Sequence, residues 1–146
     1  MIYHKLYTET FVVAISKKSY LNAHTFIENG IHYIDLLALK NESLILNRKQ
    51  SAIRSAAIDI ISKVTNNPNV FLESESLDIV ISLVENNIGI TIISKKQIDL
   101  LNDRNINFYQ IEDIYNPSFE AVVEYSSNFP LNNASKEFIS MLLEKN

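Results

Sequence analysis

Apolar residues in this chain occur in short runs that alternate with longer segments of helical spacing. Six runs rich in β-branched and aromatic residues predict strands, at 10–15, 43–47, 69–73, 89–94, 107–111 and 119–125. Apolar residues spaced three and four apart predict helices at 51–66, 76–86 and 132–145, with shorter helices at 34–39 and 96–104. Strands that alternate with helices predict an α/β fold with a largely parallel sheet flanked by helices.

The ends of the predicted helices carry recognisable signals. Ser76 is placed to cap the helix at 76–86, and Asp78 lies near the positive end of its dipole. The helix at 51–66 ends before Pro68. At the C-terminus, Asn132 or Asn133 is the expected cap of a helix that buries three apolar residues, Phe138, Met141 and Leu142.

Composition narrows the classes of protein that this chain can belong to. A chain of 146 residues without an internal repeat predicts one domain, 1–146. The net charge of −4 argues against broad binding to a phosphate backbone. The absence of cysteine removes disulfides and thiolate sites and fits a reducing cytoplasm. No apolar segment approaches the ~20 residues that a membrane helix requires, so we expect no membrane contact.

The residues that usually carry chemistry form no strong catalytic or metal motif. His4, His24 and His32 lack metal-ligand spacing, and two glycines cannot build a phosphate-binding loop. No serine lies in a nucleophile motif. Glu73 and Glu75 are close enough in sequence for acid and base work, which leaves an enzyme as a third hypothesis, but such residues more often cap helices. We therefore expect no catalytic residue, no metal ion and no cofactor.

Two polar turns are the candidate site. Ligands collect at the carboxyl ends of the strands in an open parallel sheet, where helix N-termini expose unpaired amides. The turns that follow the runs at 43–47 and 69–73 fit this position, and they supply the ligand-binding candidates Asn47, Arg48, Lys49, Gln50, Ser51, Glu73, Ser74, Glu75 and Ser76. Their hydroxyls, amides and charges suit a small carboxylate, sulfate or amino acid. The alternative is that both are ordinary solvated turns.

The pattern resembles the effector-binding domain of LysR-type transcriptional regulators. The most specific part is the middle of the chain, and the residues that carry the resemblance there are Leu44-Ile45-Leu46, Arg54, Ile58-Asp59, Glu73, Leu83-Val84 and Gly89-Ile90. Looser similarity covers 10–15, 34–39 and the end of the chain, through Val122-Val123-Glu124-Tyr125, Ala134 and Phe138-Ile139. The chain departs from the family pattern at Ser19-Tyr20-Leu21, Ala38, Ile88 and Ser94.

The resemblance implies a lobe of the type II periplasmic binding protein fold. Residues 16–118 would form the second sensor lobe, and 1–15 with 119–146 would be remnants of the first. The helix-turn-helix and most of the first lobe would be missing, so DNA would be bound only through an absent N-terminal domain. The chain would supply half of an effector site and work in the cytoplasm. It would pair as a homodimer through the helix at 51–66 or through apolar surface left bare by the missing first-lobe strands. The alternative is that the outer side of this helix, with Arg54, Ser55 and Lys63, is only solvated. The alternative is a free-standing small-molecule-binding or protein-interaction module without a DNA partner.

Overall fold

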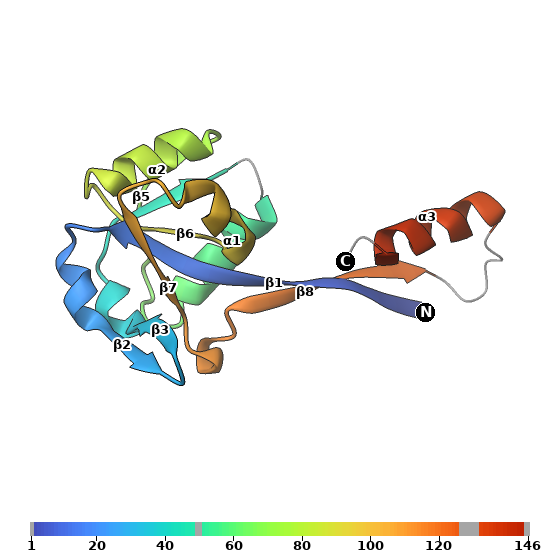
Figure 1. The fold of residues 1–146 in the computed structure, drawn as a ribbon, viewed down its shortest axis with the longest axis horizontal. Coiled ribbons are helices and arrows are strands. Elements are labelled where there is room, and N and C mark those ends of the chain that lie inside the picture. Colours follow the sequence, from blue (N-terminus) through green and yellow to red (C-terminus); the bar gives the residue numbers. More distant parts are fainter. Residues whose placement is uncertain (1, 49–50, 126–131, 145–146) are drawn as a thin grey trace. The chain divides into compact units, whose positions relative to one another are not determined.

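The computed structural model describes residues 2–48, 51–125 and 132–144. These residues form two units, Thr10–Pro117 and a second one that combines Met1–Glu9 with Ser118–Asn146. The strands are β1 (Ile2–Ser16), β2 (Thr25–Glu28), β3 (Ile31–Ile34), β4 (Leu44–Asn47), β5 (Val70–Ser74), β6 (Thr91–Ser94), β7 (Ile106–Gln110) and β8 (Ser118–Tyr125). The helices are α1 (Ser51–Ile61), α2 (Leu77–Glu85) and α3 (Asn133–Glu144), with short 3-10 helices η1 (Tyr20–His24), η2 (Leu36–Leu39), η3 (Lys95–Leu101) and η4 (Asp113–Tyr115) (Figure 1).

The sheet of the larger unit is built around β1. Its strand order is β2-β3-β7-β1-β6, and β1 runs antiparallel to both of its neighbours, β6 and β7. The β2–β3 pair is antiparallel as well, whereas β3 and β7 are parallel. A second, two-stranded sheet contains β4 and β5, which run parallel to each other. The fold is therefore α/β with a mixed sheet.

The expectation of a largely parallel sheet is wrong, because a strand from the start of the chain lies between two later strands. The strands β6 and β7 are joined through η3 and run in the same direction, but β1 lies between them and runs the opposite way. Alternating strands and helices indicate crossovers, yet they do not say whether a strand from elsewhere in the chain is inserted between two parallel ones.

The core explains why the apolar runs fold as they do. Residues 11–16 of β1 are buried throughout, as expected for a strand covered on both faces. One cluster joins alternate residues of β1 to α2, β4, β6 and β7, and its buried members are Val12, Ala14, Ile45, Val80, Ile81, Val84, Ile93, Leu101 and Ile106. Figure 1 shows α2 beside the strands that it packs on. The predicted apolar face of this helix is thus confirmed.

A β-hairpin of the larger unit was not among the predicted elements. Strands β2 and β3 pair through a tight turn in which Asn29 and Gly30 have φ angles of 53° and 77°. Asn-Gly is the dipeptide that favours this kind of two-residue hairpin turn, because both residues tolerate positive φ. The sequence therefore contained the signal, although the flanking strands are too short and too exposed to show clear alternation.

One predicted helix, α1, is shorter than expected. The helix ends at Ile61 rather than at residue 66. The residues that follow form a tighter turn, in which the amide of Val64 donates to the carbonyl of Ile61 at 3.0 Å. One of the two expected caps of α3 is confirmed, because Oδ1 of Asn132 accepts a hydrogen bond from the amide of Ser135 at 2.8 Å.

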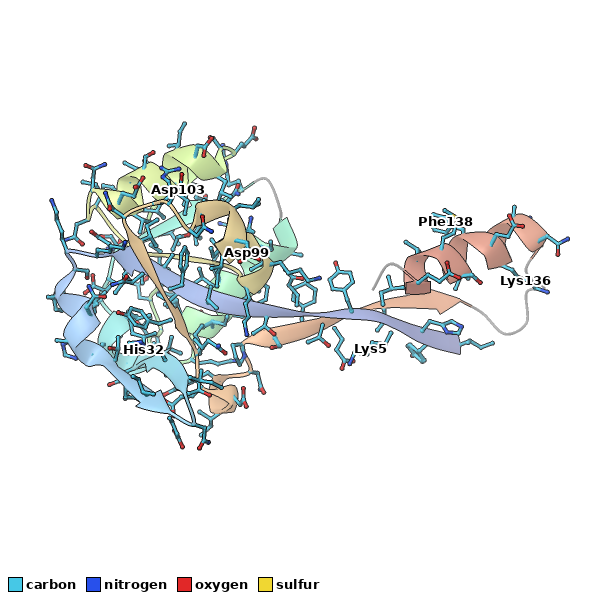
Figure 2. All side chains as sticks on the ribbon, in the orientation of Figure 1. Lys5, His32, Asp99, Asp103, Lys136 and Phe138 are labelled. Atoms are coloured by element: carbon cyan, nitrogen blue, oxygen red, sulfur yellow. The ribbon has the colours of Figure 1, made fainter. Side chains whose placement is uncertain are left out.

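The smaller unit pairs β8 with β1 and adds α3. An ion pair between Lys5 and Glu120, 3.2 Å from Nζ to Oε1, joins the two strands. The expected burial of Phe138 and Met141 is wrong for the described residues: Phe138, labelled in Figure 2, is 61% exposed, and Met141 is exposed too. Only Leu142 of the predicted set is half-buried. Helical spacing shows which residues share a face, but not whether another element covers it.

Candidate functional site

The two candidate turns follow strands that lie side by side. Because β4 and β5 are parallel neighbours, their carboxyl ends meet at the same edge, where Asn47 pairs with Ser74. Beyond the last pair, the amide of Arg48 donates to the carbonyl of Ser74 at 2.9 Å. The structure thus brings Asn47 and Arg48 next to the turn at 73–76, although the two segments are more than twenty residues apart.

Two serines organise the turn at the end of β5. The amide of Ser76 donates to Ser74 Oγ at 3.1 Å, and the amide of Ile79 donates to Ser76 Oγ at 3.4 Å. Ser76 is therefore the N-cap of α2, as the sequence predicted, and Asp78 lies in the first turn. A hydroxyl that accepts a backbone hydrogen bond keeps its own proton to donate, so both serines retain the capacity to bind an acceptor group.

Glu73 is held by an arginine from α1. The guanidinium of Arg54 makes an ion pair with the carboxylate of Glu73, and both side chains are partly exposed. The hydrogen bond from Arg54 is the main cause that lowers the pKa of Glu73, and the charges of Arg54 and Arg48 lower it further, against desolvation. A carboxylate that stays ionised near neutral pH accepts hydrogen bonds and is a poor proton donor.

Sequence reasoning missed the role of Arg54. It left this residue on the outer side of the helix, either facing a partner copy or solvated, because the helical spacing marks only the apolar face. The contact joins residues nineteen positions apart on different elements, and no local pattern encodes such a pair. The excess of acidic over basic residues in the chain does not indicate which acidic residue Arg54 contacts.

The remaining candidates are placed as follows. Glu75 is exposed, and it stands beside Glu73 in the turn without sharing its arginine contact. Lys49 and Gln50 lie outside the described residues. Ser51 is the first residue of α1. The site that can be described therefore consists of Asn47, Arg48, Glu73, Ser74, Glu75 and Ser76, with Arg54 added.

The histidines do not gather into a metal site. Nε2 of His32 lies 3.2 Å from Thr25 Oγ1, and its ring packs edge-on against Tyr109. Figure 2 labels His32 on the hairpin. Among the residues that the structure describes, no group of three or more histidines and carboxylates is arranged to hold a metal ion. In the same residues, no helix is long and apolar enough to span a bilayer.

Comparisons with known proteins bear on the family and on the fold of this chain. A family model described as the LysR substrate binding domain matches residues 1–146. No protein in a search of curated sequences matches significantly.

Solved structures of low sequence identity share the fold. The effector-binding domain of QuiR in complex with shikimate is 21% identical, with a TM-score of 0.68 over 99% of this chain and 64% of that one. The Synechocystis CcmR regulatory domain in complex with 2-PG is 17% identical, with a TM-score of 0.69 over 99% of this chain and 66% of that one. The C-terminal domain of a probable LysR family regulator from Rhodococcus is 15% identical, with a TM-score of 0.72 over 97% and 66% of the two chains. The chain thus spans just under two thirds of the length of these structures.

Proposed function

This chain belongs to the LysR substrate-binding domain family, and from that premise we propose that it senses a small-molecule effector for a transcriptional regulator. The observation that carries the proposal is the match of the family model to every residue from 1 to 146. Effector binding would shift the orientation of lobes or subunits and so control an attached DNA-binding domain. No covalent step is part of this function.

We assign the two units of the chain to the two sensor lobes. The second lobe would be 16–118, and the first-lobe segments would be 1–15 and 119–146. The division of the chain into Thr10–Pro117 and a unit that combines both ends supports this assignment, except that it places residues 10–15 with the larger unit. A regulator of transcription acts where DNA is, so we place the protein in the cytoplasm, with DNA bound through a separate N-terminal domain.

The effector would bind at the edge formed by the ends of β4 and β5. Arg48 and the serine hydroxyls of Ser74 and Ser76 provide donors beside the N-terminus of α2, a combination that suits a carboxylate or an inorganic anion. The carboxylates of Glu73 and Glu75 suit the ammonium group of an amino acid. With Asn47, Lys49, Gln50 and Ser51, these residues would form half of the site.

A thermal-shift screen tests the proposed site. We expect an amino acid, small organic acid or inorganic anion to raise the melting temperature of a longer natural form with both lobes, because a ligand at 100 times its Kd stabilises the folded state by about 2.7 kcal/mol. This chain alone should respond weakly. Arg48→Gln and Ser74→Ala should each weaken the response about tenfold or more in ligand concentration.

The control is Ser62→Ala, an exposed serine beyond the end of α1, which should leave the response intact. If a ligand still raises the melting temperature of both site variants, the effector binds elsewhere. No response in either form would favour an interaction module that works without a small molecule.

We further propose that two copies pair through β5 and α1. Three apolar residues of β5 are exposed, Val70, Phe71 and Leu72, and β5 pairs only with β4 within the described residues. Phe71 is 57% exposed. An exposed apolar strand at a sheet edge offers both backbone hydrogen bonds and apolar area to a partner.

Static light scattering checks the pairing. The wild-type chain should show twice the monomer mass of 16.7 kDa, and Phe71→Asp should shift it to the monomer, because a charge on the edge opposes strand pairing. Leu100→Asp, at an exposed leucine of η3, should leave the dimer intact. A wild-type monomer at high concentration would count against the proposal.

A further inference from the structure

A polar cavity of about 350 Å³ lies in the larger unit, away from the candidate effector turns. It forms where β1 and α2 end and β7 begins, three elements labelled in Figure 1. The residues that line it are Ser16, Lys17, Lys18, Glu85, Asn86 and Asn105. Its volume lies in the ~300–1,000 Å³ range typical of small-molecule sites.

Hydrogen bonds between the three elements fix the walls of the cavity. Ser16 Oγ donates to the carbonyl of Glu85 at 3.2 Å, and the amide of Lys17 donates to the carbonyl of Asn105 at 3.2 Å. The amide of Asn105 in turn donates to Glu85 Oε2 at 3.0 Å. The lining backbone is therefore preorganised, so a ligand would not have to order it.

The negative groups at the cavity are already compensated. Arg104 Nε donates to Glu85 Oε1 at 2.8 Å, and a second guanidinium nitrogen contacts the same oxygen. The hydrogen bond from Arg104 is the main cause that lowers the pKa of Glu85. The carbonyls of Ser82, Val84 and Glu85 in the last turn of α2 each accept a hydrogen bond. The negative end of the helix is thus largely satisfied by protein donors.

The positive groups have no such compensation. Lys17 and Lys18 are both exposed, and among the described residues neither ammonium group makes an ion pair or a hydrogen bond. The cavity therefore carries two uncompensated positive charges in a chain whose net charge is −4. Side-chain amides from Asn86 and Asn105 add groups that bind hydroxyls.

We propose that this cavity binds a small hydroxylated dianion of the sugar phosphate class. The phosphate group lies between the ammonium groups of Lys17 and Lys18, whose two charges match its own. The hydroxyl groups of the ligand contact the amides of Asn86 and Asn105. Because α2 begins in the candidate effector site and ends at this cavity, the two sites are separated by about 13 Å, the length of a nine-residue helix.

Calorimetric titration of the chain with glycerol 3-phosphate tests the proposal. At about 0.01 M ionic strength, where charges are screened only beyond ~30 Å, we expect glycerol 3-phosphate to bind, inorganic phosphate to bind more weakly and glycerol not to bind. The double substitution Lys17→Gln and Lys18→Gln should weaken binding of glycerol 3-phosphate at least about tenfold. Both side chains are exposed, so the fold should persist, which circular dichroism would verify.

The matched control is Lys95→Gln with Lys96→Gln, a second pair of adjacent exposed lysines, on η3. It changes the net charge equally and should leave the affinity nearly unchanged. Equal losses in the two double variants would mean diffuse attraction and would overturn the proposal, as would the absence of binding to the wild-type chain. Equal affinity for inorganic phosphate would refute the role given to the hydroxyl groups. Arg48→Gln should not alter this binding, which separates the cavity from the effector site.

Discussion

Replacing Gly89 with alanine is expected to lower the free energy of unfolding by about 3 kcal/mol, the upper range for overpacking. A Cβ at this position would lie 2.5 Å from the carbonyl oxygen of Ser43 and 3.1 Å from Cδ1 of Ile45. The contact cannot be relieved by moving the backbone alone. The amide of Ile90 donates to that same carbonyl at 2.9 Å, and the amide of Ile45 donates to the carbonyl of Ile90 at 2.8 Å.

Urea unfolding would measure the loss, with Gly30→Ala as the control. Gly30 has open space around it, but its φ of 77° makes an alanine strained by about 1–2 kcal/mol. The loss at Gly89 should therefore exceed the loss at Gly30. Equal losses, or a smaller one at Gly89, would show that the chain relaxes around the added methyl group. Since Ser43 directly precedes β4, the Gly89 variant should also disturb the turn that carries Asn47.

Truncating Ile81 to alanine should cost about 3 kcal/mol, within the range measured for buried isoleucines. Ile81 is 0% exposed, and it belongs to the cluster that packs α2 against β1, β4 and β6. Alanine removes apolar area and leaves a cavity that the surrounding strands cannot fill without losing their pairing. Denaturant unfolding monitored by circular dichroism would measure the change.

The same helix supplies the control for this prediction. Ile79 is 52% exposed on α2, so Ile79→Ala removes the same atoms with the same gain in helix propensity but little burial. We expect it to cost less than about 1 kcal/mol. Similar costs at Ile79 and Ile81 would contradict the placement of α2 on the sheet.

Local patterns predicted the elements of this fold well. The strand and helix positions from β4 to β8 lie within a few residues of the predictions, and the cap at Ser76 was identified correctly. These features depend on the periodicity of the backbone and on neighbouring residues, which the sequence displays directly. The hairpin at Asn29-Gly30 was not predicted, because its two strands are too short and too exposed to show alternation.

The candidate site was predictable in part. Its two turns could be predicted because strand ends and helix N-termini are visible in the sequence. The parallel pairing of β4 and β5 brings the two turns together. The ion pair between Arg54 and Glu73 could not be predicted, since it depends on how α1 is placed beside β5. The cavity at Lys17 and Lys18 likewise requires three elements to meet.

The sequence by itself determined which residues form strands and helices, where α2 is capped, and the family resemblance that the comparisons support. Only the tertiary structure decided strand direction, the exposure of Phe71 and Phe138, and the long-range contacts of Arg54 and Arg104. The physical reason is that local structure follows from spacing within a few residues. Direction, burial and distant pairing depend on the path of the whole chain.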